Sequence, residues 1–300
     1  MYETHFGLKR RPFSLSPDTD LFVNLTDHEQ CFELLIHVLE HGEGFLKVVG
    51  DVGIGKTILC RKLLGYLKNK NNRLFYPVYI PNPMLSPIGL YRAVGMELGL
   101  TSRQKNDNDT LLHHINERIL KLAESDKSVV IVIDEAQSLP PETLEALRLI
   151  SNLETEQKKL VQIILFGQTE LDALLDQKRF RQLRQRITFS HYLKPLSTDE
   201  MQRYIEFRLL QSGYNGPALF TRKAFSALYK SSKGVPRMIN VLAHKALMAA
   251  FSDQTRQVDK KHIIRAADAG QASTTMPNYA TMFVIFSVML FAGAIAWRFL

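Results

Sequence analysis

Cysteine is scarce in this 300-residue chain, which contains only Cys31 and Cys60. Both lie in apolar helical patterns, so we expect reduced thiols in a core and no disulfide framework. The sequence has no metal-ligand spacing and no internal repeats, and residues 1–20 lack the apolar segment of a signal peptide. These absences exclude a disulfide-stabilised secreted protein and favour a protein that folds in the cytosol.

Charge of one sign is concentrated in one part of the chain. The net charge is +8, with 45% hydrophobic and 23% charged residues, which is ordinary for a globular protein. Residues 191–270 carry 13 basic and 6 acidic side chains. Such a region suits contact with nucleic acid or with an anionic membrane surface, and it equally suits an exposed lysine-rich helical surface.

The segment Gly50–Thr57 reads GDVGIGKT and matches the pattern G-x-x-x-x-G-K-[ST] directly after the apolar run Phe45–Val49. Glycines let backbone N–H groups approach phosphate oxygens, and a following helix directs its positive N-terminus at the anion. We predict that Lys56 reaches the β- and γ-phosphates of ATP and that the Thr57 hydroxyl ligates Mg²⁺. The predicted nucleotide-binding residues are Gly50, Asp51, Val52, Gly53, Ile54, Gly55, Lys56, Thr57 and Ile58.

Two carboxylates follow a second apolar run. Val129–Ile133 is typical of a fully buried parallel strand, and Asp134 and Glu135 come directly after it. The carboxyl ends of such strands face the ligand crevice of an α/β sheet. We predict that Asp134 helps to hold Mg²⁺ and that Glu135 is the general base for the attacking water.

Arginines near the end of the sheet region are candidates for transition-state contacts. Arg184 and Arg186, with Arg179 and Arg181 nearby, lie on a predicted short helix before Ile187, where one of them could reach a neighbouring subunit's γ-phosphate. Alternatively, each of these arginines belongs to a basic surface that faces solvent or binds a partner. Arg237, in the turn Gly234-Val-Pro-Arg237, could fold back onto the phosphates, unless it belongs to an ordinary helix start.

The pattern along the chain predicts an α/β parallel sheet with a helical appendage. Strands alternate with helices between residues 43 and 190, so we assign 1–190, including an N-terminal segment 1–42, to a nucleotide-binding domain. Residues 191–269 form a predicted helical lid, and 270–279 lack periodicity and read as a linker.

Residues 280–297 carry no charge and would span about 27 Å as a helix, against a hydrocarbon core of about 30 Å. Tyr279 and Trp297 bracket this segment as interfacial aromatics do. We predict a single C-terminal transmembrane helix that contacts the lipid bilayer, with the ATP-binding part in the cytoplasm. The alternative for this segment is an apolar helix that packs against a partner protein or in an oligomer interface.

Together these motifs resemble the AAA+ ATPases of the general secretion pathway protein A (ExeA/GspA) group. The similarity runs from residue 1 to about 269 and includes the phosphate loop, Asp134-Glu135, the stretch Gly167–Leu171, the run Arg181–Ile187 and Gly234–Arg237. Within the group, the short chain is most similar to the ATPases of MSHA-type IV pilus biogenesis. Ile54, Ile58 and Thr169 depart from the residues that the group usually carries.

The resemblance implies a P-loop NTPase of the AAA+ kind that binds ATP and Mg²⁺ and assembles into a ring or a higher-order homo-oligomer. It implies a sensor-1 role for Gln168 and a place near the adenine for the residues around Phe13 and His28. It further implies partners among pilus or secretion assembly proteins at the inner membrane.

Three functions therefore remain in view. The first is a membrane-anchored ATPase that drives assembly of a pilus or secretion apparatus. The second is a DNA-handling ATPase of the initiator or transposition-helper kind, although we do not expect nucleic acid to be the partner, because residues 270–297 read as a linker and an apolar segment instead of a DNA-reading domain. A scaffold without hydrolysis is disfavoured by Glu135, and ABC transporters and GTPases by the lack of LSGGQ and Asn-Lys-x-Asp motifs.

Overall fold

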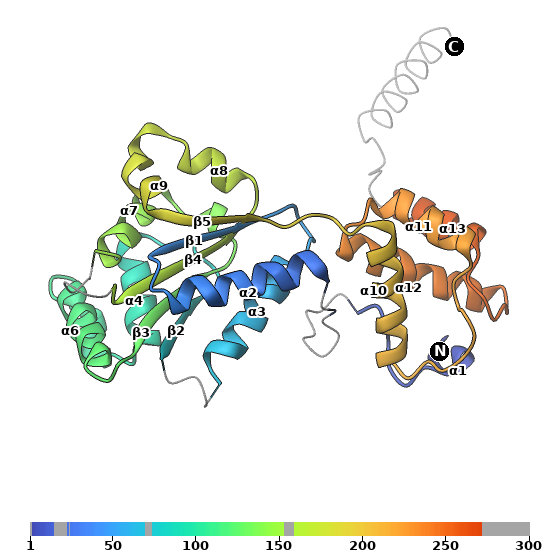
Figure 1. Ribbon diagram of the computed structural model, residues 1–300, viewed down its shortest axis with the longest axis horizontal. Helices are drawn as coiled ribbons and strands as arrows, with labels where there is room; N and C mark the ends of the chain where they lie inside the picture. Colours follow the sequence, from blue (N-terminus) through green and yellow to red (C-terminus); the bar gives the residue numbers. More distant parts are fainter. Residues whose placement is uncertain (1, 15–22, 24, 70–73, 153–158, 272–300) are drawn as a thin grey trace, which may run out of the picture.

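A parallel β-sheet forms the larger part of the molecule. The computed structural model describes residues 2–14, 23, 25–69, 74–152 and 159–271. In these residues a five-stranded sheet has the order β2-β3-β4-β1-β5, and every neighbouring pair is parallel (Figure 1). The strands are β1 Phe45–Val49, β2 Phe75–Ile80, β3 Ser128–Ile133, β4 Val161–Gly167 and β5 Ile187–Tyr192. The predicted α/β class with a parallel sheet is confirmed.

Some helices cover both faces of the sheet, and others form a separate group beside it. Those packed around the sheet are α2 Thr26–Glu40, α3 Lys56–Leu67, α4 Pro87–Glu97, α5 Ser102–Asn106, α6 Leu111–Ala123, α7 Pro141–Ile150, α8 Glu170–Leu175 and α9 Arg181–Arg186, with the short 3₁₀ turns η2 Ala136–Ser138 and η3 Lys178–Phe180. The others are α1 Tyr2–Phe6, α10 Thr198–Gln211, α11 Arg222–Ser232, α12 Pro236–Ser252 and α13 Lys260–Gln271.

Burial on both faces explains the near-continuous apolar strands. On one face, α2 and α3 belong to an apolar cluster with Leu46 and Val48 of β1. On the other face, α4, α6, α7, α8 and α9 belong to a second cluster, which includes Phe45 and Val49. All of Val129–Ile133 in β3 is buried, as predicted for a strand with helices on either side. Strand β5 continues to Tyr192, two residues past the predicted boundary at 190, because its pairing with β1 runs on to that residue.

The two cysteines are free and buried, as predicted for core thiols. Cys31 of α2 and Cys60 of α3 lie in the same apolar cluster between these helices and the sheet. Burial raises the pKa of the Cys31 thiol to about 12 and raises the pKa of Cys60 as well. Both thiols are therefore protonated at neutral pH.

Helices α10–α13 form a second core, which we call the lid. Its buried residues include Met201 and Ile205 of α10, Leu228 of α11 and Leu247 of α12. The predicted helix start after Lys194-Pro195 is a capping box. The Ser197 hydroxyl accepts a hydrogen bond from the backbone N–H of Glu200, and the Glu200 carboxylate accepts one from the backbone N–H of Ser197. The lid lies beside the sheet, on the side where β5 ends (Figure 1).

The first part of the N-terminal segment belongs to the lid core, whereas α2, from the same segment, packs on the sheet. The prediction placed all of 1–42 with the nucleotide-binding domain. Tyr2, Phe6 and Phe13 are buried among the lid helices. The backbone carbonyl of Pro12 accepts a hydrogen bond of 2.7 Å from Nε of the buried Arg208. A lid of four helices has little apolar interior of its own, so these N-terminal aromatics supply part of its core.

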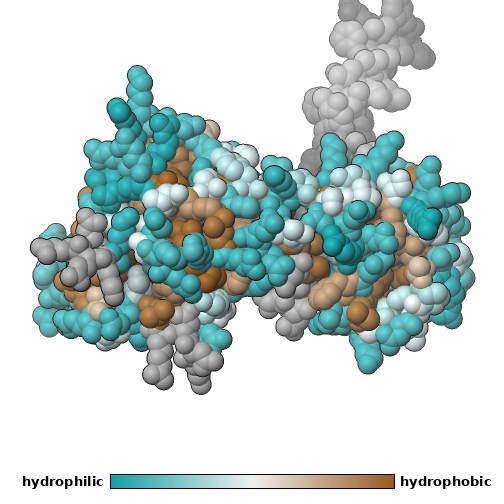
Figure 2. Space-filling model, in the orientation of Figure 1, coloured by the Kyte–Doolittle hydropathy of each residue, from teal (hydrophilic) through white to brown (hydrophobic). Residues whose placement is uncertain are grey.

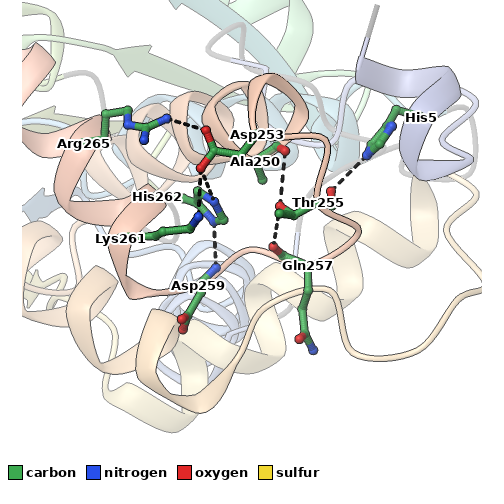
Figure 3. Close-up of polar contacts among 9 residues, drawn as sticks. All are labelled: His5, Ala250, Asp253, Thr255, Gln257, Asp259, Lys261, His262 and Arg265. Atoms are coloured by element: carbon green, nitrogen blue, oxygen red, sulfur yellow. Dashed lines mark hydrogen bonds and ion pairs between the residues drawn. The ribbon is translucent and has the colours of Figure 1, made fainter.

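Polar contacts fix the turn between α12 and α13 (Figure 3). Asp253 forms ion pairs with Lys261 at 2.9 Å and Arg265 at 2.8 Å, and these cations hold the pKa of its carboxyl well below the usual range. Nδ1 of the buried His262 accepts a hydrogen bond from the backbone N–H of Asp259 at the start of α13. The backbone carbonyl of Thr255 in the same turn accepts a bond of 2.9 Å from His5 of α1.

The predicted C-terminal features fall mostly outside the described residues. Helix α13 continues to Gln271, two residues into the predicted linker 270–279, and the remainder of that linker lies beyond the described part. The predicted transmembrane segment 280–297 also lies beyond it. Among the helices that the structure describes, none is both long and apolar enough to cross a membrane. Figure 2 shows one face of both parts, mostly covered by hydrophilic side chains with smaller apolar areas among them.

Candidate functional site

Strand order brings the predicted motifs to one edge of the sheet. Strands β3, β4 and β1 are neighbours, and their carboxyl ends are Ile133, Gly167 and Val49. Gly50 follows β1, Asp134 follows β3 and Gln168 follows β4, so parallel pairing places them side by side. The three sequence motifs therefore form one candidate site.

The phosphate loop between β1 and α3 depends on glycine at two positions. Gly53 has φ 81° and Gly55 has φ 112°, backbone conformations that other residues adopt only with strain. A Cβ on Gly53 would lie 2.7 Å from Cβ of Arg237, and one on Gly55 would lie 2.8 Å from Nε2 of His28. The loop is thus enclosed by α12 on one side and by α2 on the other.

Lys56 begins α3 and is almost fully buried. Its ammonium donates hydrogen bonds of 2.8 Å to the carbonyl of Gly50 and 2.9 Å to that of Asp51. Burial lowers the pKa of Lys56, while the negative charges of Glu135 and Asp134 act in the opposite direction. The loop therefore carries a desolvated ammonium held by its own carbonyls and close to two carboxylates.

Thr57 and Asp134 meet across the gap between α3 and β3. Asp134 is 3% exposed, and burial raises the pKa of its carboxyl, whereas a hydrogen bond with the Thr57 hydroxyl lowers that pKa. The described residues contain no group of three or more His, Cys, Asp and Glu side chains arranged for a metal. Two adjacent oxygen ligands fit Mg²⁺, which is commonly bound by one or two protein ligands together with substrate phosphates.

Glu135 adopts a left-handed backbone conformation with φ 53° and ψ 39°. Its backbone N–H donates to Oδ1 of Asp134 at 3.0 Å. Its carboxylate oxygen Oε2 accepts hydrogen bonds from Nε2 of Gln137 at 2.6 Å and from Nε2 of Gln168 at 3.2 Å. Glu135 and Gln168, both predicted as site residues, are thus in direct contact. Gln137 was not predicted as a site residue from the sequence, although it follows Glu135 by only two residues.

Arg237 lies against the phosphate loop. Its backbone N–H donates to the carbonyl of Gly53 at 3.1 Å, at the first turn of α12. The lid thus contacts the loop through its backbone, and the Arg237 side chain is exposed.

Arg184 and Arg186 lie at the opposite edge of the sheet. Ile187, which follows them, pairs with Phe45 at the start of β1, whereas the phosphate loop follows the end of that strand. The length of β1 separates the two places by roughly 16 Å. Arg184 forms an ion pair of 2.9 Å with Asp176, and Arg186 donates to the Ser151 hydroxyl at 3.0 Å.

The two residues that the resemblance implied near the adenine have different contacts. His28 of α2 donates from Nε2 to the carbonyl of Ile54 at 3.0 Å, because a carbonyl can only accept, and burial lowers the pKa of this histidine. Phe13 is packed edge to face against Phe220 in the lid. Ile54, a departure from the group pattern, is fully buried beside α2 and α3, which explains an apolar residue there.

Comparison with known proteins agrees with this geometry. Residues 39–175 match the AAA domain family. The protein is thus an α/β protein that carries an AAA domain. The chain is 38% identical over 267 residues to general secretion pathway protein A of Aeromonas hydrophila. The aligned region covers 89% of this chain and 48% of that protein. The resemblance to the general secretion pathway protein A group is therefore confirmed, and the chain spans about half the length of this relative.

Solved structures share the fold at low sequence identity. The Aeropyrum pernix ORC2 protein in ADPNP–ADP complexes matches with a TM-score of 0.63 and 15% identity, over 91% of this chain and 74% of that one. The Thermotoga maritima RuvB Holliday junction branch migration motor matches with a TM-score of 0.55 and 18% identity, over 86% and 72%. These matches show that the fold of this chain occurs in both proteins.

We predict that Gly53→Ala destabilises the protein by about 1–3 kcal/mol, because a Cβ at this position meets a strained backbone and Arg237. The matched control is Gly65→Ala in α3, where φ is ordinary and no atom lies within 4 Å of the added carbon. That change should stabilise the protein by roughly 0.5–1 kcal/mol. Thermal or urea denaturation measures both; equal stability of the two variants would contradict the tight contact between loop and lid.

Proposed function

We propose that this protein is a Mg²⁺-dependent ATPase. One observation carries the proposal: Lys56, the Thr57–Asp134 pair and Glu135 lie together at the carboxyl edge of the parallel strands β1, β4 and β3. Backbone N–H groups of Gly50–Ile58 would cradle the phosphates, with Lys56 on the β- and γ-phosphates. Thr57 and Asp134 would hold Mg²⁺, which neutralises phosphate charge.

Glu135 is the residue that suits proton transfer. Its carboxylate stands next to the loop, and one of its oxygens is held by Gln137 and Gln168. Glu135 then accepts the proton of the attacking water, while Gln168 stays close enough to respond to the γ-phosphate. Arg237 reaches the phosphates from the lid, whose backbone already contacts Gly53.

Arg184 and Arg186 fit a role across a subunit interface. Their place at the opposite edge of the sheet prevents contact with the phosphates of their own subunit, so either would act on a neighbour in a homo-oligomer. One such arginine contributes about 10³- to 10⁵-fold in rate where this arrangement has been measured.

The cellular role that we favour is assembly of a secretion apparatus or of an MSHA-like type IV pilus at the inner membrane. Support comes from the similarity to general secretion pathway protein A over 89% of the chain. The uncharged segment 280–297 would anchor the protein as a single pass in the bilayer, with the ATPase part in the cytoplasm. Its partners would be assembly proteins of that apparatus.

A DNA-handling ATPase is the second candidate. The fold matches the Aeropyrum pernix ORC1 protein in complex with DNA with a TM-score of 0.63 and 19% identity, over 94% of this chain and 76% of that one. The basic balance of residues 191–270 favours the same candidate. Salt-sensitive retention of the full chain on duplex DNA would select it over the assembly role.

Lys56→Ala should abolish ATP binding, because the loop loses the ammonium that meets the phosphates. Glu135→Gln should keep binding and lose about 10²- to 10⁴-fold in turnover, since the amide cannot accept the proton. Fluorescent-nucleotide titration and phosphate release measure the two effects. Lys68→Ala, which removes an exposed charge at the end of the same helix, is the control. Equal turnover by Glu135→Gln and wild type would remove Glu135 from the role of base.

Mixing experiments test the arginines. Arg184→Ala or Arg186→Ala subunits, inactive alone, should regain ATPase activity when mixed with Lys56→Ala subunits, because each supplies what the other lacks. Activity is followed across mixing ratios, with the assembly state checked by light scattering. If no ratio restores turnover in intact assemblies, neither arginine acts in trans.

Truncation tests the anchor. A chain ending at Gln271 should be soluble and still bind ATP, whereas the full chain should resist both alkaline and high-salt extraction from membranes. A spanning helix survives high salt, but electrostatic attachment by the basic lid does not. Release of the full chain by high salt alone would contradict a spanning segment.

A further inference from the structure

Gln137 contacts two parts of the candidate site at once. It lies in the 3₁₀ turn η2 directly after Glu135 and Ala136. Its Nε2 donates to Oε2 of Glu135 at 2.6 Å, and its Oε1 accepts from the backbone N–H of Gln168 at 3.0 Å. One side chain thus joins the proposed base to the backbone at the end of β4.

The chemistry of these two contacts restricts the residue type. An ionised carboxylate only accepts hydrogen bonds and a backbone N–H only donates, so the side chain between Glu135 and Gln168 must donate at one atom and accept at the other. A primary amide does both, and the two partners determine which atom of the Gln137 amide is the nitrogen. A carboxylate of the same length at this position could accept hydrogen bonds but could not donate one. A thioether cannot donate and accepts only weakly.

The bonds also define the orientation of Glu135. Its left-handed backbone, with φ 53°, is uncommon for a residue with a side chain, and such strain is retained where surrounding contacts enforce it. The Asp134 carboxylate holds the Glu135 backbone N–H, and both Gln137 and Gln168 hold Oε2. These bonds leave Oε1 as the oxygen that can accept a proton from water.

We infer that Gln137 is a positioning residue for ATP hydrolysis: it fixes the carboxylate of Glu135 and ties it to Gln168, so that base and γ-phosphate sensor move together. This inference rests on the proposed ATPase function. Gln137 does not touch the phosphates in this scheme, so its loss should lower kcat and leave nucleotide affinity unchanged.

The test compares Gln137→Met, Gln137→Glu and, as a control, Ser138→Ala, an exposed side chain in the same turn. Gln137→Met keeps the length and removes both bonds, so kcat should fall by about 10- to 100-fold, the effect of losing one hydrogen bond to a charged group, with KM and nucleotide Kd unchanged. Gln137→Glu loses the donor to Glu135 and should lower kcat at least as much. Ser138→Ala should behave as wild type.

Amide hydrogen exchange of the nucleotide-free full chain separates the two contacts. The backbone N–H of Gln168 should exchange faster in Gln137→Met, which lacks an acceptor, and should stay protected in Gln137→Glu, which keeps one. A merely structural role would change stability without this division.

Several results would overturn the inference. Unchanged kcat in Gln137→Met would do so, as would a higher kcat, because a rise would show that the contact restrains Glu135. Unchanged exchange at Gln168 in Gln137→Met would show that the bond contributes nothing. Absence of ATP hydrolysis by the wild type would instead overturn the proposed function itself, and with it any role for Gln137 in turnover.

Discussion

Parallel pairing of β3, β4 and β1 is the constraint on which the candidate site depends. The ladder between these central strands places three chain segments, distant in sequence, at one edge of the sheet. Each segment continues differently: β1 into a glycine loop and helix, β3 into two carboxylates, and β4 into Gln168. Because helices pack on both faces, a slip in register would move each side chain to the opposite face and disrupt its packing with the helices. The core therefore stabilises the positions of Lys56, Asp134 and Gln168.

The lid is attached to this edge by backbone contacts. The Arg237 N–H donates to the Gly53 carbonyl, and a Cβ on Gly53 has no room beside Arg237. The lid core also includes the N-terminal aromatics, so the chain passes between lid and sheet both before α2 and after β5. Two connections restrict how the lid moves relative to the loop, and α2, which follows the first of them, holds the loop through His28.

Burial disfavours the charged forms of Lys56 and Asp134 at the site. Burial lowers the pKa of Lys56 and raises that of Asp134, so each group loses hydration that the opposite charge nearby partly replaces. Glu135 is oriented by neutral amides of Gln137 and Gln168, which add no charge to the cluster. A phosphate and a divalent cation would bring compensating charges to this edge.

Local sequence by itself determined the strands, the phosphate loop and the carboxylate pair, because short-range pattern and glycine spacing specify these features. Val129–Ile133 is apolar throughout because it is buried on both faces, and the segment Gly50–Thr57 needs no distant contact to be recognised. The tertiary structure alone determines where Phe13, Arg184 and Gln137 lie. Their positions depend on which elements pack together. Phe13 lies in the lid core, Arg184 lies at the edge of the sheet opposite the loop, and Gln137, after β3, contacts Gln168 at the end of the neighbouring β4. Such contacts join residues far apart in sequence, and no local periodicity encodes them.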